Sequence, residues 1–130
     1  MSTIYHTSKA PEFPLPFSQA IRAGDFVYVS GQVGVDPQTR QVVGDTIEEQ
    51  TVQCLRNLET ILQEAGLTLD HVVKTNAHVS RGEDIPAFNK AYESVMNAPY
   101  PTRTTVVSGI GTYLIEIDVI AYAPTRRGEA

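Results

Sequence analysis

The sequence predicts one α+β domain spanning residues 1–130, in which two helices pack on one face of a β-sheet. A chain of 130 residues can bury about two thirds of its unfolded surface in a single core. Apolar residues recur with a period of 2 in some segments, which indicates strands, and of 3.6 in others, which indicates helices. The predicted order is strand, strand, helix, strand, helix, strand, strand. Two helices with one apolar stripe each can cover only one face of the sheet, which leaves the other face open.

The composition is typical of a globular protein and argues against several functional classes. Ten Lys and Arg residues against fifteen Asp and Glu residues give a net charge of −5, which argues against nucleic acid as a partner. No apolar run approaches the roughly 20 residues of a membrane span, so no membrane partner is expected. Residues 1–6 lack the features of a signal peptide. The single cysteine, Cys54, excludes an internal disulfide and a cysteine zinc site. We therefore expect a cytoplasmic protein.

The first third of the chain predicts an extended segment followed by two strands. Three prolines within residues 11–17 are incompatible with a helix, because proline lacks an amide hydrogen and fixes its own φ. Residues 18–22 predict a short strand, and a turn leads from it into a second strand at 26–30, which is rich in aromatic and β-branched residues. Gly31 ends this strand, and its missing side chain lets another group approach the backbone closely.

A brief strand is expected at 41–43, followed by a helix that begins after Thr46 and stops at Gly66. Thr46 and Glu49 have the spacing of a capping box, in which each side chain satisfies a free amide of the other residue. Apolar residues then recur at helical intervals along one face: Ile47, Cys54, Leu55, Leu58, Ile61, Leu62 and Ala65. Cys54 belongs to this stripe, so we expect a small buried thiol with a structural role.

The second half of the chain predicts a strand, a helix and two further strands. Residues 71–80 alternate between apolar and polar side chains, and strands are also expected at 103–107 and 114–123. The helix between them is expected to begin at Asp84, with Pro86 tolerated in its first turn. Its inner face consists of Phe88, Ala91, Tyr92 and Val95. The polar tail from Pro124, which includes the basic pair Arg126-Arg127, is expected to be solvated and frayed.

The strand at 114–123 has two different faces. One face carries Ile115, Ile117, Val119, Ala121 and Ala123, and the other carries Leu114, Glu116, Asp118, Ile120 and Tyr122. The second face is too apolar to be left in water, although it also carries acidic residues. An uncovered sheet face of this mixed character predicts a homo-oligomer with pockets where subunits meet.

Arg103 and Glu116 are the candidate functional residues. Arg103 follows a proline-stiffened turn at 100–102 and begins a β-branched strand. An arginine fixed near a carboxylate can hold an organic acid and allow a proton to move beside it. Spacing alone, however, favours a structural ion pair between Arg103 and Glu116 or Asp118, and a solvated role for Glu116.

Other chemistry-bearing residues give weaker signals. The three histidines, His6, His71 and His78, lack the pairing of zinc ligands, so we expect surface or interface roles and no metal site. Ser30 precedes a glycine but has neither a Gly-x-Ser-x-Gly frame nor an obvious histidine partner, which argues against a serine hydrolase.

Short segments that resemble one family run through nearly the whole chain. They include Pro16-Phe17-Ser18-Gln19-Ala20, Val29-Ser30-Gly31-Gln32-Val33, Phe88-Asn89-Lys90-Ala91-Tyr92, Pro101-Thr102-Arg103 and Ile115-Glu116-Ile117. In this order and spacing, the set resembles the reactive-intermediate deaminase A family (RidA, also called YjgF). The resemblance implies a chorismate-mutase-like fold with a mostly antiparallel sheet, assembled as a homotrimer with three sites at subunit interfaces.

The resemblance also implies an activity and a set of site residues. The implied reaction is hydrolysis of 2-imino acids and their enamine tautomers, such as 2-iminobutyrate and 2-iminopropionate, to 2-oxo acids and ammonia. No cofactor is implied. Carried over to this chain, Arg103 would hold the substrate carboxylate and Glu116 would activate the attacking water. The implied substrate-binding residues are Phe17, Ser30, Gly31, Asn89 and the backbone at Thr105.

Two positions depart from the family pattern, and two alternatives to the deaminase stay open. Phe17 stands where many members have tyrosine, which removes a hydroxyl and leaves the substrate range open. Thr105 stands where many have cysteine, a mild change because the residue stays small and keeps its backbone groups. The first alternative is a trimer that binds small carboxylates or a partner protein without catalysis, as a sensor or chaperone-like module. The second is an endoribonuclease, against which the acidic charge balance argues.

Overall fold

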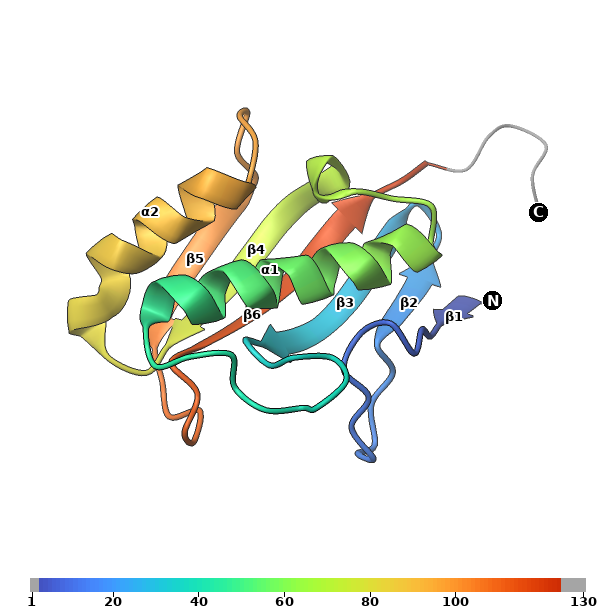
Figure 1. The fold of residues 1–130 in the computed structure, drawn as a ribbon. Helices are drawn as coiled ribbons and strands as arrows, with labels where there is room; N and C mark the ends of the chain where they lie inside the picture. The colour runs from blue at the N-terminus through green and yellow to red at the C-terminus, as the bar shows by residue number, and fades with distance from the viewer. Residues whose placement is uncertain (1–2, 125–130) are drawn as a thin grey trace.

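Two α-helices, α1 (Ile47–Glu64) and α2 (Ile85–Val95), lie on the same side of one β-sheet (Figure 1). The computed structural model describes residues 3–124. Within that range the sheet has six strands: β1 (Thr3–Tyr5), β2 (Ala20–Ala23), β3 (Phe26–Val33), β4 (Val72–Val79), β5 (Thr102–Val107) and β6 (Ile115–Tyr122). This arrangement confirms the predicted α+β class with two helices on one face. None of the helices in residues 3–124 is long and apolar enough to cross a membrane.

The strand order is β1-β2-β3-β6-β4-β5. Every neighbouring pair is antiparallel except β4 and β5, which run parallel and are joined through α2. The sheet is therefore mixed, with mostly antiparallel pairing. The crossover through α2 carries the chain over the helical side of the sheet and places β5 at the edge, next to that helix.

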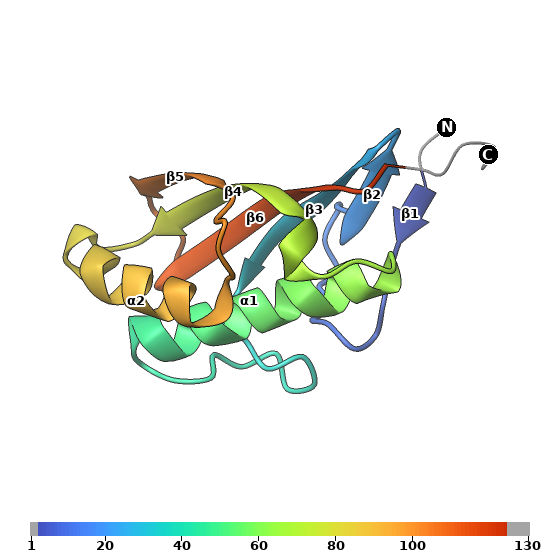
Figure 2. The same ribbon diagram turned by 90° about the horizontal axis from the view of Figure 1, so that it is seen from above.

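The two faces of β6 differ as its alternation predicts. Ile115, Ile117 and Ala121 are fully buried beneath the helices. Figure 2 shows both helices below the sheet, and no element within residues 3–124 covers the side above it. We call that uncovered side the open face. Tyr28 and Tyr122 on it are each 46% exposed, which is a large apolar surface for a sheet to leave in water.

The boundaries of α1 follow from its capping residues. The Thr46 hydroxyl accepts a hydrogen bond from the Glu49 amide at 3.2 Å and donates to the Glu49 carboxylate at 2.8 Å. Thr46 therefore caps the helix as predicted, although Glu49 binds the cap hydroxyl where a full capping box would use the backbone amide. At the other end Gly66 adopts a φ of +76°, and the Leu67 amide bonds back to the Leu62 carbonyl at 2.9 Å.

Several local predictions need correction. The strand expected at 18–22 begins only at Ala20, because the Gln19 side chain is buried and bonds to the backbone of Thr7 and Pro11. The segment at 41–43 forms one isolated bridge, from Val42 to Val35, and no strand.

Two further elements differ from the expectation at the start of the chain and of α2. Asp84 precedes α2 but makes no capping bond, since its carboxylate accepts from Arg81 at 2.9 Å. Strand β1 was not predicted, because three residues are too few to show alternation. The expected solvated pair Arg126-Arg127 lies outside the described residues.

Cys54 is fully buried, as the apolar stripe predicts, and its thiol donates to the Gln32 carbonyl at 3.0 Å. Burial raises the pKa of this thiol well above its usual range, so almost no thiolate forms near neutral pH. Because only the thiolate is nucleophilic, we expect the folded protein to react with a disulfide reagent such as DTNB at least roughly 100-fold more slowly than the urea-unfolded chain. Rapid, complete labelling without denaturant would contradict this prediction.

Candidate functional site

The candidate site residues other than Thr105 fall into two groups that line separate pockets. Arg103 and Asn89 line a pocket of about 280 Å³ between α2 and the edge strand β5. Phe17, Ser30, Gly31 and Glu116 line another, of about 340 Å³, where the proline-rich segment meets β3 and β6.

The guanidinium of Arg103 is held in place by α2. Arg103 lies beside the fully buried Thr75 in the parallel register of β4 and β5, so its side chain is on the helical side of the sheet. Its central carbon lies 5.0 Å from the Tyr92 ring centroid and 5.1 Å from that of Phe88. Its Nη2 donates to Asn89 Oδ1 at 2.7 Å. Two aromatic faces and one amide therefore fix the charged group.

Tyr92 supports this arrangement as a neutral phenol. Burial raises its pKa, although its hydrogen bond with Thr75 and the nearby Arg103 charge act in the opposite direction. The two hydroxyl groups of Tyr92 and Thr75 are 3.0 Å apart. Because the ring carries no charge near neutral pH, Arg103 keeps its positive charge available for a ligand.

Arg103 makes no ion pair with a carboxylate of the described residues: the salt bridges within residues 3–124 involve other groups. The pairing with Glu116 or Asp118 that spacing alone favours therefore does not form within the chain. Asn89 occupies one of the five N–H donors of the guanidinium, which leaves others for a planar, bidentate ligand such as a carboxylate.

Glu116 lies against a strand irregularity that makes room for it. The pairing of β3 with β6 shifts between Val29 and Gln32, so Ser30 and Gly31 form a bulge beside Glu116. A Cβ atom at Gly31 would lie only 2.8 Å from Glu116 Oε2. A side chain at residue 31 would therefore displace the Glu116 carboxylate, which agrees with the predicted close approach to the Gly31 backbone. The prediction that Gly31 ends the strand is wrong, because β3 continues through the bulge to Val33. The Ser30 hydroxyl donates to the Ser18 carbonyl at 2.5 Å.

Arg103 and Glu116 are on opposite sides of the sheet within one chain. Glu116 pairs in register with His78 and lies between the buried residues Ile115 and Ile117, so it faces the open side. Arg103 faces the helices. The structure thus brings Arg103 together with Asn89, and Glu116 together with Phe17, Ser30 and Gly31. It does not bring these two groups together in a single chain.

Thr105 follows the Arg103 side of β5. Its register partner is Ala77, which is almost fully buried on the helical side. The Thr105 hydroxyl is buried and has no hydrogen-bond partner among the described residues. The Thr105 hydroxyl oxygen is therefore a polar atom without a partner among the described residues, on the same side of β5 as Arg103, while the Thr105 backbone pairs within the sheet.

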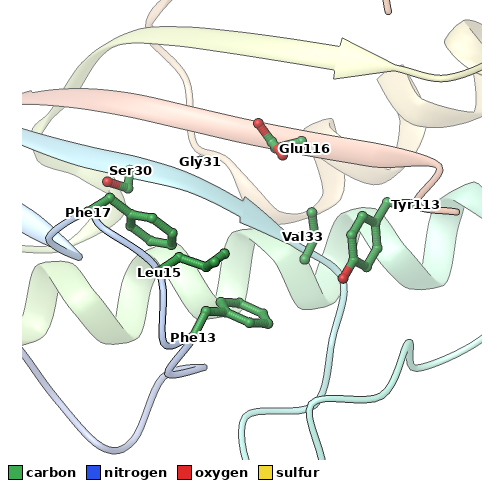
Figure 3. A pocket seen from close by; sticks show the side chains of 8 residues that line it. All are labelled: Phe13, Leu15, Phe17, Ser30, Gly31, Val33, Tyr113 and Glu116. Carbon is green, nitrogen blue, oxygen red and sulfur yellow. The ribbon is translucent and has the colours of Figure 1, made fainter. Parts of the chain in front are cut away.

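Sequence reasoning missed several residues of the two pockets. Phe13, Leu15 and Tyr113 line the Glu116 pocket (Figure 3), and Tyr92 and Tyr100 line the Arg103 pocket. The alternation of Phe13, Leu15 and Phe17 with prolines could have indicated a rigid apolar wall. For Tyr92, the predicted inner helix face gave a signal of core packing only.

The family model described as endoribonuclease L-PSP matches residues 7–123. The chain belongs to this family, the YjgF/RidA family. Among its YjgF/RidA relatives is a RutC family protein of Saccharolobus solfataricus, which is 43% identical over 93% of this chain and 98% of the relative.

Two other members of the YjgF/RidA family carry more specific names. A 2-iminobutanoate/2-iminopropanoate deaminase of Dermatophagoides farinae is 33% identical over 79% of this chain and 80% of the relative. The crystal structure of RidA from an Antarctic Psychrobacter species matches with a TM-score of 0.87 and 33% identity, covering 92% of this chain and 98% of that one. The fold described above is therefore the fold of this family.

Proposed function

We propose that this protein hydrolyses reactive 2-imino acids and their enamine tautomers to 2-oxo acids and ammonia. The observation that carries the proposal is the guanidinium of Arg103, fixed by Asn89 and two aromatic rings and free of any ion pair with residues 3–124. Family membership and the printed name of the Dermatophagoides relative support the same chemistry.

Arg103 binds the substrate carboxylate. Its planar fork donates two parallel charge-assisted hydrogen bonds and keeps its charge at any working pH. Hydrogen bonds to charged groups are worth about 1.5–3 kcal/mol each, whereas an exposed ion pair is worth about 0–1 kcal/mol. The two rings cover part of the exposed guanidinium, and a neighbouring chain at the proposed interface would remove more of it from water, which favours the larger of these two energies.

Glu116 handles the protons of the reaction. As the oxygen of a water molecule forms a bond with the imine carbon, Glu116 accepts one proton from that water, and the C=N electron pair moves to nitrogen, which takes up a proton. Glu116, ionised again once it has passed the water proton to the nitrogen, then accepts the hydroxyl proton of the carbinolamine and delivers it to the amino group; the C–N bond breaks with its electron pair on nitrogen, and ammonia and the 2-oxo acid leave. A positioned acid–base group of this kind contributes roughly 10²–10⁴-fold to the rate.

The site forms between subunits of a homotrimer. Because Arg103 and Glu116 face opposite sides of the sheet, a complete site needs the β5 edge of one chain against the open face of another. Such a head-to-tail contact uses two different surfaces and closes into a ring when the rotation allows it. Covering the open face would remove the exposed aromatic residues Tyr28 and Tyr122 from water, which favours association of the subunits through this face. Phe17, Ser30, Gly31 and Thr105 complete the proposed pocket.

The activity can be tested with a competition assay. A threonine dehydratase generates 2-iminobutyrate, semicarbazide traps it, and added protein is expected to divert the imine to 2-oxobutyrate and ammonia. We therefore expect the rate of semicarbazone formation to fall as the protein concentration rises. An unchanged rate over the whole concentration range would contradict the deaminase for this substrate.

The same preparation separates the alternatives. Saturable binding of 2-oxobutyrate without turnover of any imine would identify a carboxylate-binding module. The printed description of the family model names an endoribonuclease, so RNA cleavage is measured in parallel. If the Arg103→Ala variant still cleaved RNA, the cleavage would belong to a different site or to a contaminant.

A further inference from the structure

We infer that the Glu116 pocket selects 2-imino acids with large apolar side chains, and that Phe13, Leu15 and Phe17 determine this specificity. The inference rests on the proposed function, because it assigns a substrate class to the same site. Three properties of the pocket support it: the apolar lining, the rigid segment that forms one wall, and the volume.

The lining of the pocket is mainly apolar. Phe13, Leu15, Phe17, Val33 and Tyr113 form its walls, and among the described residues Glu116 is its only charged group. The Ser30 hydroxyl is already engaged, since it donates to the Ser18 carbonyl. A second carboxylate on the substrate side chain would therefore meet no cation in the lining from this chain and would lie near the like charge of Glu116, while the neighbouring chain's Arg103 already holds the first carboxylate.

Three of these apolar residues come from one rigid segment. The Leu15 amide bonds to the Phe13 carbonyl and the Phe17 amide to the Leu15 carbonyl, both at 2.8 Å. These are two successive γ-turns, with Pro14 and Pro16 at their centres. The proline ring fixes φ near the value that an inverse γ-turn needs. In Figure 3 the side chains of Phe13, Leu15 and Phe17 extend from this segment in the same direction, towards Val33 and Tyr113.

A wall of this kind requires little ordering when a substrate binds. Leu15 and Phe17 are 59% and 46% exposed in the single chain, so an apolar group that enters the pocket covers surface that the chain itself leaves in water. Because the prolines already restrict the backbone, little conformational entropy is lost on contact. The segment is therefore suited to bind an apolar side chain.

The volume indicates the size of the preferred group. The pocket measures about 340 Å³, at the lower end of small-molecule sites, which run from roughly 300 to 1,000 Å³. A methyl group would leave most of this space to water, whose share of liquid volume is about 30 Å³ per molecule. An isobutyl or benzyl group would displace much more of that water and contact the three wall residues.

The test compares imines of different size with the native protein. L-Amino-acid oxidase generates the imines of leucine, phenylalanine and alanine in place, and semicarbazide competition reports the kcat/KM for each. We expect the leucine- and phenylalanine-derived imines to be hydrolysed with at least about 10-fold higher kcat/KM than the alanine-derived imine, since even one methylene in an apolar pocket can be worth about 10-fold.

Variants of the wall connect this preference to the structure. Leu15→Gln, which keeps the length but adds a polar end, is expected to reduce the large-to-small ratio of kcat/KM by about 5-fold or more. Leu15→Met retains an apolar chain and should keep the ratio. Val43→Gln, which also replaces an exposed apolar residue but lies outside the pocket, should leave the ratio unchanged.

The outcomes separate the two levels of the proposal. Equal kcat/KM values for all three imines, or a ratio that Leu15→Gln does not change, would overturn the specificity while the deaminase stands. Failure to hydrolyse any imine would overturn the proposed function, and the specificity with it. Preferential hydrolysis of the large imines, lost in Leu15→Gln and kept in Leu15→Met, is the expected result.

Discussion

Replacement of Arg103 by alanine is expected to lower kcat/KM for 2-iminobutyrate hydrolysis by roughly 10²–10⁴-fold, because two charge-assisted hydrogen bonds of about 1.5–3 kcal/mol each are lost. Arg103 is exposed at the sheet edge, although its guanidinium packs on the buried rings of Phe88 and Tyr92, so we expect the variant to fold with a small loss of stability. Steady-state rates measure the loss, and circular dichroism with size-exclusion chromatography shows whether fold and assembly are kept.

Two further variants show whether the fork geometry or simply the charge matters. Arg103→Lys retains a cation but offers a point charge in place of the planar fork, so we expect it to recover little of the activity. Arg81→Ala removes a different exposed arginine, which pairs with Asp84 at 2.9 Å, and should leave kcat/KM unchanged. An Arg103→Ala protein that retained activity within about 3-fold of the native value would contradict the assigned role.

Glu116→Gln is expected to reduce kcat by roughly 10²–10⁴-fold, since the amide cannot accept the proton of the attacking water. The replacement keeps the size of the side chain, so the close packing against Gly31 is preserved. The decisive measurement mixes this variant with Arg103→Ala by unfolding both together and refolding them.

Each variant alone should be nearly inactive, whereas the mixture should recover activity. In a ring where each site takes Arg103 from one chain and Glu116 from its neighbour, random mixing in equal amounts makes about one quarter of the sites complete. A mixture of Arg103→Ala with Asn89→Ala is the matched control, because both residues belong to the same half of the site and mixing cannot raise activity above the mean of the two variants alone. If the Arg103→Ala and Glu116→Gln mixture stayed inactive, the two residues would not act across an interface.

Much of the fold could be predicted from sequence because its signals are local. The alternation in β6 correctly separates a buried face, with Ile115 and Ile117, from an open face with Glu116. The helical stripe of α1 and its stop at Gly66 are likewise local features. Short elements were placed less well: β1 has only three residues, and Val42 forms a single bridge.

The relation between Arg103 and Glu116 could not be predicted in this way. Strand β5 carries polar and β-branched residues on both faces, so its sequence does not indicate which side of the sheet Arg103 occupies. That side is set by the parallel register with β4, which follows from the crossover through α2. Register depends on contacts between segments far apart in the chain, and no periodicity within β5 reports it.

The placement of Arg103 and Glu116 on opposite sides of the sheet also bears on gene dosage. In the proposed ring each subunit contributes to two sites. A subunit with an altered residue inactivates only the site that uses that residue, and its other, intact half still completes the site shared with the neighbour on the other side. A cell that carries one native and one altered allele would therefore lose activity in proportion to the altered copies. It would not show the larger, dominant-negative loss expected when a ring is active only if all of its protomers are native.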